Sequence, residues 1–252
     1  MGRVVEFVHN QEYIRALIGP AIEGLRDAEP EKFRKLLEIY LQDKPVRSIR
    51  DANESIFQCI VEILLDERKY RIPELLLVVD GTKERRDGRF GFPDIFLLPT
   101  LSGRLGVVLE LKYMTLEGLW RGSQKEKQYA LRRPTHEELA ELADVIRKEN
   151  EEELWGRRYG YFTKKGGISF TTVRDVMEDA KGQLKRYLDV IKEGKAKGNG
   201  RGVADNRVMI AQWQGHDSLF GYVFIGIGGR RVLVSERRYV QTFHQYQRTW
   251  TE

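Results

Sequence analysis

Three charged residues stand inside two apolar runs, Asp94 in "GFPDIFLLP" and Glu110 and Lys112 in "GRLGVVLELKYM". A buried charge costs several kcal/mol unless it is paired, hydrogen-bonded or bound to a metal ion. The two-residue period of a strand places Glu110 and Lys112 on one face, while Leu109 and Leu111 point to the other. Charges displayed together on strands of this kind indicate a chemical role.

The segment "PTLSGR" between the two runs predicts a turn with its tip near Ser102. Antiparallel pairing about that tip sets residue i opposite about residue 204 minus i, so that Asp94 faces Glu110. Paired Cβ atoms lie roughly 4.5 to 5.5 Å apart, and two carboxylates there repel each other unless a cation lies between them. Such oxygen ligands suit Mg²⁺ or Mn²⁺.

Lys112 lies on the same face as Glu110 and would orient or help to deprotonate a water, or stabilise charge on phosphorus. These groups together form the apparatus of a hydrolase. A structural salt bridge from Lys112 to Glu110 or Asp94 is the alternative.

The elements that must position these residues follow from hydrophobic spacing. We expect a helical lead-in over residues 10–43, a core helix at about 53–67, and a helix at 174–194. The stripe of the core helix is a set of regularly spaced aliphatic residues: Ile56, Ile60, Ile63 and Leu64.

Short apolar runs predict strands at 74–80, 91–99 and 103–114, and further strands after residue 206. Thr135 and Glu138 match a capping box that opens an acidic helix over 135–155. A hairpin is expected between that helix and the helix at 174–194, because two aromatic or β-branched runs flank Gly166 and Gly167.

"FPD" followed 16 positions later by "ELK", with a Glu-bearing helix upstream, resembles the PD-(D/E)xK nuclease superfamily. The resemblance implies an α/β fold with a restriction-endonuclease-like core, a mixed central β-sheet flanked by helices, preceded by a helical lead-in and carrying an inserted acidic helix. In that fold a helix precedes three antiparallel strands, the motif lies on the second and third, and a helix and a further strand complete the sheet. "RVMIAQW" is expected as that further strand.

Carried over to this chain, the resemblance makes Asp94, Glu110 and the Leu111 carbonyl ligands of Mg²⁺ or Mn²⁺, and Lys112 the catalytic lysine. It makes Glu54 the helix-borne acid that some members use as a further ligand. An ordinary acid in the first turn of a helix is the alternative for Glu54.

Gln183 and Tyr187 match the Q-x-x-x-Y motif of the superfamily, and their spacing places them on one helical face. A surface amide and a core aromatic side chain are the alternatives. More narrowly, the chain looks like the nuclease domain at the C-terminal end of AAA-ATPase-like proteins of bacteria and fungi, but it has no G-x-x-x-x-G-K-[ST] loop. We expect a helical lead-in at 1–48, a nuclease-like domain at 49–240 with an insertion at about 115–172, and a tail at 241–252.

Composition fits a globular protein, with 41% hydrophobic and 32% charged residues among 252. No apolar run approaches the roughly 20 residues that span a bilayer, and the N-terminus lacks the features of a signal peptide. The single cysteine, Cys59, lies in an apolar helical pattern that predicts a buried thiol. We therefore expect no membrane association and an intracellular location, without a choice between cytoplasm and nucleus.

The net charge of +5 is compatible with a phosphate-rich partner. Basic segments at 192–202 and 230–238 would follow a nucleic acid backbone, and the acidic helix at 135–155 would lie away from it or contact a protein. The four histidines have no zinc-ligand spacing. The sequence thus predicts a metal-dependent nuclease, with DNA favoured over RNA; a catalytically inactive module of the same fold that binds nucleic acid or protein is the alternative, and self-association is left open.

Overall fold

The computed structural model describes most of the chain. The described residues are 2–44, 52–65, 70–99, 105–124, 131–198, 200–211, 217–235, 238–242 and 244–249. Within them, no helix is both long and apolar enough to cross a membrane.

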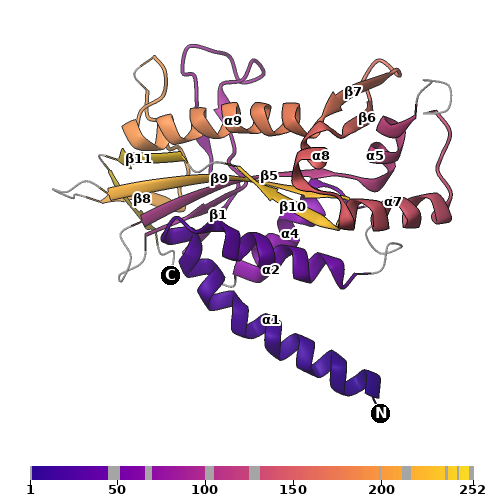
Figure 1. The fold of residues 1–252 in the computed structure, drawn as a ribbon. Coiled ribbons are helices and arrows are strands. Elements are labelled where there is room, and N and C mark those ends of the chain that lie inside the picture. The colour runs from indigo at the N-terminus through magenta and orange to yellow at the C-terminus, as the bar shows by residue number, and fades with distance from the viewer. Residues whose placement is uncertain are drawn as a thin grey trace.

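A mixed β-sheet forms the centre of the protein (Figure 1). Its strands lie in the order β1, β4, β5, β9, β10, and β11 also pairs with β9. Neighbours β1, β4 and β5 are antiparallel, β9 runs parallel to β5, and β10 and β11 run antiparallel to β9. The bounds are β1 Arg71–Pro73, β4 Ile95–Leu97, β5 Leu105–Met114, β9 Asp217–Ile227, β10 Arg231–Val234 and β11 Arg238–Thr242.

Helices cover both faces of this sheet (Figure 1). The residues of one core cluster come from one face and from α1 Gly2–Arg26, α2 Pro30–Gln42 and α4 Glu54–Leu65. The other cluster joins the opposite face to α5 Leu116–Ser123, α7 His136–Lys148, α8 Glu151–Gly156 and α9 Val173–Glu193. The predicted α/β architecture, a mixed central sheet flanked by helices, is confirmed at this level.

The first strand of the sheet differs from the prediction. β1 ends at Pro73, before the apolar run at 74–80, because Glu74 adopts a positive φ of 48° and its N–H donates to the Asp94 carbonyl at 2.9 Å. The run at 74–80 instead supplies β2 (Leu77–Val78), which pairs with β3 (Phe90–Gly91) in a separate two-stranded sheet. The predicted strand at 91–99 is therefore divided between β3 and β4.

The strand beside β5 is also not the one expected. β8 (Val208–Ala211), within "RVMIAQW", pairs with β12 (Gln245–Arg248) outside the central sheet, and β9 occupies the place parallel to β5. Met209 and Ile210 on β8 remain 49% and 37% exposed. The longer β9 buries apolar side chains on both faces, as a central strand requires.

The core helix forms as α4, but the predicted stripe is only partly buried: Leu64 is buried and Ile60 packs partly buried against the core, whereas the other two residues are exposed. Ile56 and Ile63 are 45% and 60% exposed, and Cys59 is exposed, so the prediction of a buried thiol is wrong. The buried side chains are Phe57, Val61, Leu64 and Leu65. The helix carries apolar residues on more than one face, and the face that enters the core is the one whose Phe57 ring packs against Tyr113.

The segment between β5 and α9 contains the predicted capping box and hairpin. Thr135 and Glu138 cap α7 reciprocally, and Asn150 caps a second helix, α8, so the acidic helix expected over 135–155 is two helices. β6 (Arg158–Phe162) and β7 (Ile168–Thr172) form the hairpin. It leads directly into α9, at one end of the sheet (Figure 1).

Candidate functional site

The strand register that the sequence predicted is confirmed. Ile95 pairs with Leu109 and Leu97 with Val107, which is the relation i opposite 204 minus i. Continuing that register by one residue sets Asp94 opposite Glu110. The two acids thus lie on neighbouring strands, at the end of β4 and inside β5.

Hydrogen bonds to both the backbone and the side chain of Asp94 hold this residue in place. The Leu111 N–H donates to Asp94 Oδ2 at 2.6 Å, beyond the end of the β4 ladder. The Asp94 carbonyl accepts from Gln58 Nε2 at 3.3 Å and from the Glu74 N–H at 2.9 Å. The carboxylate is therefore oriented from β5, while the main chain is held from α4 and from the turn after β1.

Glu110 is the most unusual group of the site. Only 1% of its surface is exposed, and its Oε1 forms an ion pair with Lys112 Nζ at 2.8 Å. Oε2 is buried and has no hydrogen-bond partner among the described residues. A buried carboxylate oxygen without a partner is costly, and a proton, a water or a cation would each remove that cost.

Lys112 joins Glu110 to the helical layer. Its ammonium lies 3.2 Å from Glu54 Oε1 and 2.8 Å from Glu110 Oε1, with 21% of the side chain exposed. Glu54, the first residue of α4, is 47% exposed. The structure therefore brings together four predicted residues: Asp94, Glu110, Lys112 and Glu54. The salt bridge from Lys112 to Glu110 that the sequence left as an alternative is also present.

The surroundings of Asp94 and Glu110 raise the pKa of both carboxyl groups. Burial raises the pKa of Asp94 to about 6, although the hydrogen bond from Leu111 opposes the change. Burial, and after it the charge of Asp94, raises the pKa of Glu110 to about 7. Burial lowers the pKa of Lys112, but the charge and hydrogen bond of Glu110 outweigh it, so that this pKa lies above its ordinary value. Carboxyl groups whose pKa is raised by burial and mutual repulsion cluster at functional sites.

Gln183 and Tyr187 lie on α9 and hydrogen-bond each other, and Tyr187 belongs to a core cluster, as its core-aromatic alternative requires. Gln183 Nε2 donates to Tyr187 Oη at 2.7 Å, and Tyr187 is 7% exposed. A side chain at Gly91 would collide with the Tyr187 ring, so this glycine allows α9 to pack closely against β3, three residues before Asp94. Within the described residues, neither side chain hydrogen-bonds the charged groups of the site.

Two neighbours were not predicted from the sequence. Gln58 lies one helical turn after Glu54 and binds the Asp94 carbonyl, so its spacing on the helix was an available signal. Phe92 belongs to the "FPD" motif itself and is 49% exposed beside the site. An exposed aromatic ring of this kind offers a surface for stacking.

The two basic segments predicted at 192–202 and 230–238 differ in how exposed their cations are. Arg230 is 2% exposed and donates to the carbonyls of Leu41 and Lys44, so it holds α2 and cannot contact a nucleic acid backbone. Lys195 and Lys197, after α9, are exposed and line a surface hollow of about 690 Å³. Acids also line that hollow, among them Asp80 and Asp189.

The donor set suits a hard divalent cation. Among the described residues, no three His, Cys, Asp or Glu side chains gather into a metal site. Mg²⁺, however, commonly uses one or two carboxylates and completes its shell with water and substrate phosphate. Asp94 and the unpartnered Glu110 Oε2 are such a pair. The Leu111 carbonyl points to the same side of β5 as the Leu111 N–H, toward Asp94. Glu54 binds Lys112 and serves here as its counter-ion.

No family model, curated protein or solved structure matches this chain.

Proposed function

We propose that this protein is a divalent-metal-dependent nuclease of the PD-(D/E)xK type, with DNA favoured over RNA. The observation that carries the proposal is the buried, unpartnered Oε2 of Glu110 opposite Asp94, with Lys112 beside it. A structural salt bridge alone would not require a second acid at this position. Asp94, Glu110 and the Leu111 carbonyl would hold Mg²⁺ or Mn²⁺.

The order of elements supports the restriction-endonuclease-like core. Helix α4 precedes the antiparallel strands β1, β4 and β5, the two motif segments lie at the second and third of these strands, and α9 and β9 follow. β9 then lies parallel to β5 in the same sheet. This is the succession that the resemblance implies.

When bound, the ion would activate water and neutralise phosphate charge. The roles of the chain's own groups follow from their placement. Lys112, held between Glu110 and Glu54, is a fixed positive charge that stabilises charge developing on the scissile phosphate. The Leu111 N–H keeps the Asp94 carboxylate in one orientation. Tyr187 and Gln183 are positioning residues, because they act through the packing of β3.

A binding module without catalysis is the second candidate. The observation that favours it is the ion pair of Lys112 with Glu110, which neutralises a buried charge without any metal. Such a module would hold nucleic acid, or a protein through the exposed acids of α7.

Cleavage assays separate the two candidates. The protein is incubated with single- and double-stranded DNA and RNA, in Mg²⁺, Mn²⁺ or EDTA, beside Asp94→Ala and Lys112→Ala. We expect metal-dependent cleavage that both substitutions abolish, whereas the matched exposed controls on α7, Asp144→Ala and Lys148→Ala, cleave as wild type. Equal cleavage by wild type and both site variants would contradict the assignment, and metal-independent binding without cleavage would favour the second candidate.

A further inference from the structure

The β6–β7 hairpin has an unusual composition. Residues 158–172, here called the hairpin arm, contain no acid. Their cations are Arg158, Lys164 and Lys165, and their aromatic residues are Tyr159, Tyr161, Phe162 and Phe170. Tyr161 and Phe162 are 42% and 54% exposed. Aromatic rings and positive charges interleaved on an exposed strand are the features with which proteins bind unpaired nucleotides.

The hairpin arm is fixed at its base to the motif strand. Side chains at Gly118 and Gly122 would collide with the Tyr159 ring and the Arg158 backbone, so α5 and β6 pack in close contact. Tyr159 Oη lies 3.4 Å from the hydroxyl of Thr115, the N-cap of α5. Thr115 follows Lys112 by three residues, roughly 10 Å along the chain. The arm therefore starts close to the proposed catalytic site.

Phe162 is held as a stacking platform. The guanidinium of Arg121 lies over the ring, 4.6 Å from its centroid, and Arg121 itself pairs with Glu117 on α5. The ring nevertheless remains 54% exposed. A ring that is supported on one face and open on the other loses little conformational freedom when a base stacks on it.

The two exposed rings lie on opposite faces of the hairpin arm. Tyr161 pairs with Ser169 and Phe162 with Ile168, and neighbouring residues of a strand alternate between faces. Lys164 and Lys165 lie in the turn between the strands, which Gly166 closes with a φ of +83°. The arm thus offers a ring on each face and two charges at its tip.

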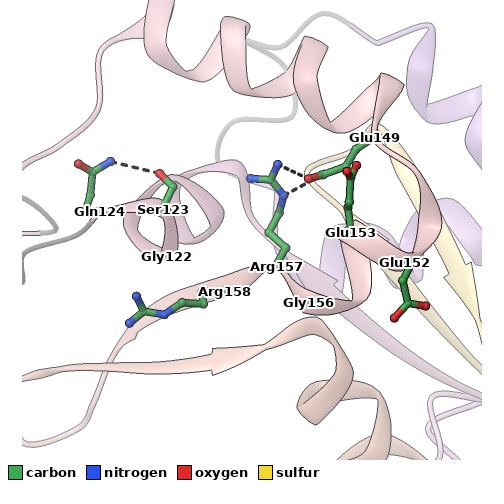
Figure 2. A pocket seen from close by; sticks show the side chains of 9 residues that line it. All are labelled: Gly122, Ser123, Gln124, Glu149, Glu152, Glu153, Gly156, Arg157 and Arg158. Atoms are coloured by element: carbon green, nitrogen blue, oxygen red, sulfur yellow. Dashed lines mark hydrogen bonds and ion pairs between the residues drawn. The ribbon is translucent and has the colours of Figure 1, made fainter.

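The hollow beside the base of the arm is lined by three acids and by two arginines, Arg157 and Arg158, so the charged groups that line it are negative on balance. Figure 2 shows Arg157 directed at Glu149, with Glu152 and Glu153 around the same hollow of about 600 Å³. Arg157 makes two hydrogen bonds to Glu149, at 2.8 and 2.7 Å. Its charge is therefore already paired, and a polyanion is favoured along the tip and faces of the arm and disfavoured in this hollow.

We propose that the hairpin arm binds single-stranded nucleic acid, by stacking bases on Phe162 and Tyr161 and pairing phosphates with Lys164 and Lys165. The inference rests on the proposed function in that it names the unpaired strand as the form of substrate that the site receives. The tip, residues 163–167, is polar and contains no apolar side chain, which disfavours insertion into a membrane. An acidic peptide would pair with the lysines but would not need the two exposed rings, Tyr161 and Phe162.

Fluorescence anisotropy in EDTA measures binding without cleavage. The probe is labelled oligo(dT) of about 16 nucleotides. We expect the double variant Tyr161→Ala/Phe162→Ala to bind at least about tenfold more weakly than wild type. Tyr13→Ala is the matched control, because Tyr13 is also exposed, at 56%, but lies on α1. Lys164→Gln/Lys165→Gln is expected to reduce the slope of log affinity against log salt by roughly 1.4.

The outcomes separate this inference from the proposed function. Equal affinity of wild type and the aromatic variant, or no binding of oligo(dT) by wild type, would overturn the role of the arm whether or not the protein cleaves DNA. Binding that depends on the arm, without cleavage in Mg²⁺ or Mn²⁺, would support the inference about the arm and contradict the proposed nuclease activity. If the arm variants lost binding to anionic lipid vesicles that wild type shows, while their binding of oligo(dT) stayed at the wild-type level, the arm would be a membrane-binding element and the inference would be overturned.

Discussion

The backbone N–H of Leu111 donates a hydrogen bond of 2.6 Å to Asp94 Oδ2, across the end of the β4–β5 pair. This contact connects the two halves of the motif, because Leu111 lies between Glu110 and Lys112 on β5. It uses one carboxylate oxygen as an acceptor and needs no negative charge. The structural role of Asp94 can therefore be separated from its proposed role as a metal ligand.

Asp94→Asn should retain the fold and lose the chemistry. An amide oxygen can still accept from the Leu111 N–H, so we expect a melting temperature close to that of wild type. Metal-dependent cleavage should fall on the order of 100-fold or more, as when one preorganised charge-stabilising group is removed. Cleavage of a labelled oligonucleotide and a thermal melt are measured on the same sample. Asp144→Asn, an exposed carboxylate on α7, is the control, and retained cleavage in Asp94→Asn would disprove the ligand role.

Lys112→Met should reveal whether a metal ion can replace the ammonium. Glu110 is 1% exposed, and without Lys112 its charge would be buried and unpaired. At pH 8, above the pKa of about 7 of Glu110, breaking a buried pair in this way costs about 3 kcal/mol in the free energy of unfolding. Urea denaturation should show that loss in EDTA and its partial recovery in Mg²⁺, because a cation at Glu110 replaces the missing charge. Lys148→Met should unfold as wild type, and a Mg²⁺-independent loss would argue against a metal site at Glu110.

The stability of the metal-free protein should depend on pH through the two acids. The pKa values of Asp94 and Glu110 rise from 3.8 to about 6 and from 4.5 to about 7, so the folded state binds protons more tightly than the unfolded state. This stabilisation is complete below about pH 4 and is lost as the pH rises through 6 to 7. One pKa unit corresponds to about 1.4 kcal/mol, which makes the loss a few kcal/mol.

Urea denaturation in EDTA at pH 5 and pH 8 tests this, with Glu110→Gln for comparison. The fall in the free energy of unfolding between the two pH values should be smaller in Glu110→Gln than in wild type, because that side chain no longer titrates. Mg²⁺ at pH 8 should stabilise wild type by binding the ionised acids. Identical pH dependence in wild type and variant would show that Glu110 titrates normally.

The hairpin of the site was predictable because its determinants are local. A turn and two apolar runs fix the register, and the two-residue period then puts Glu110 and Lys112 on one face. The contact of Lys112 with Glu54 joins residues 58 positions apart, and no local pattern contains it. The resemblance to a known family placed Glu54 at the site as a metal ligand, but it did not predict the ion pair of Glu54 with Lys112.

The errors arose where two local patterns were equally good. In α4 the helical period permits an apolar face through Ile56 and Ile63 or one through Phe57 and Val61, and packing against Tyr113 selects the second. Both β8 and β9 read as strands, but only β9 is long enough to match β5 over ten residue pairs. Such choices depend on the partner surface, which periodicity does not describe.

Gly122→Ala should loosen the hairpin arm from α5. A Cβ at this position would collide with the Arg158 carbonyl, which is backbone and has little freedom to move. Overpacking of this kind costs about 1 to 3 kcal/mol, measured by urea denaturation. Gly156→Ala is the matched control: nothing lies within 4 Å of the added atom, and alanine stabilises a helix by up to about 1 kcal/mol. If the arm acts as a rigid platform, oligo(dT) affinity should fall in Gly122→Ala and remain at the wild-type value in Gly156→Ala; unchanged affinity in both would show that the docking of β6 on α5 is irrelevant to binding.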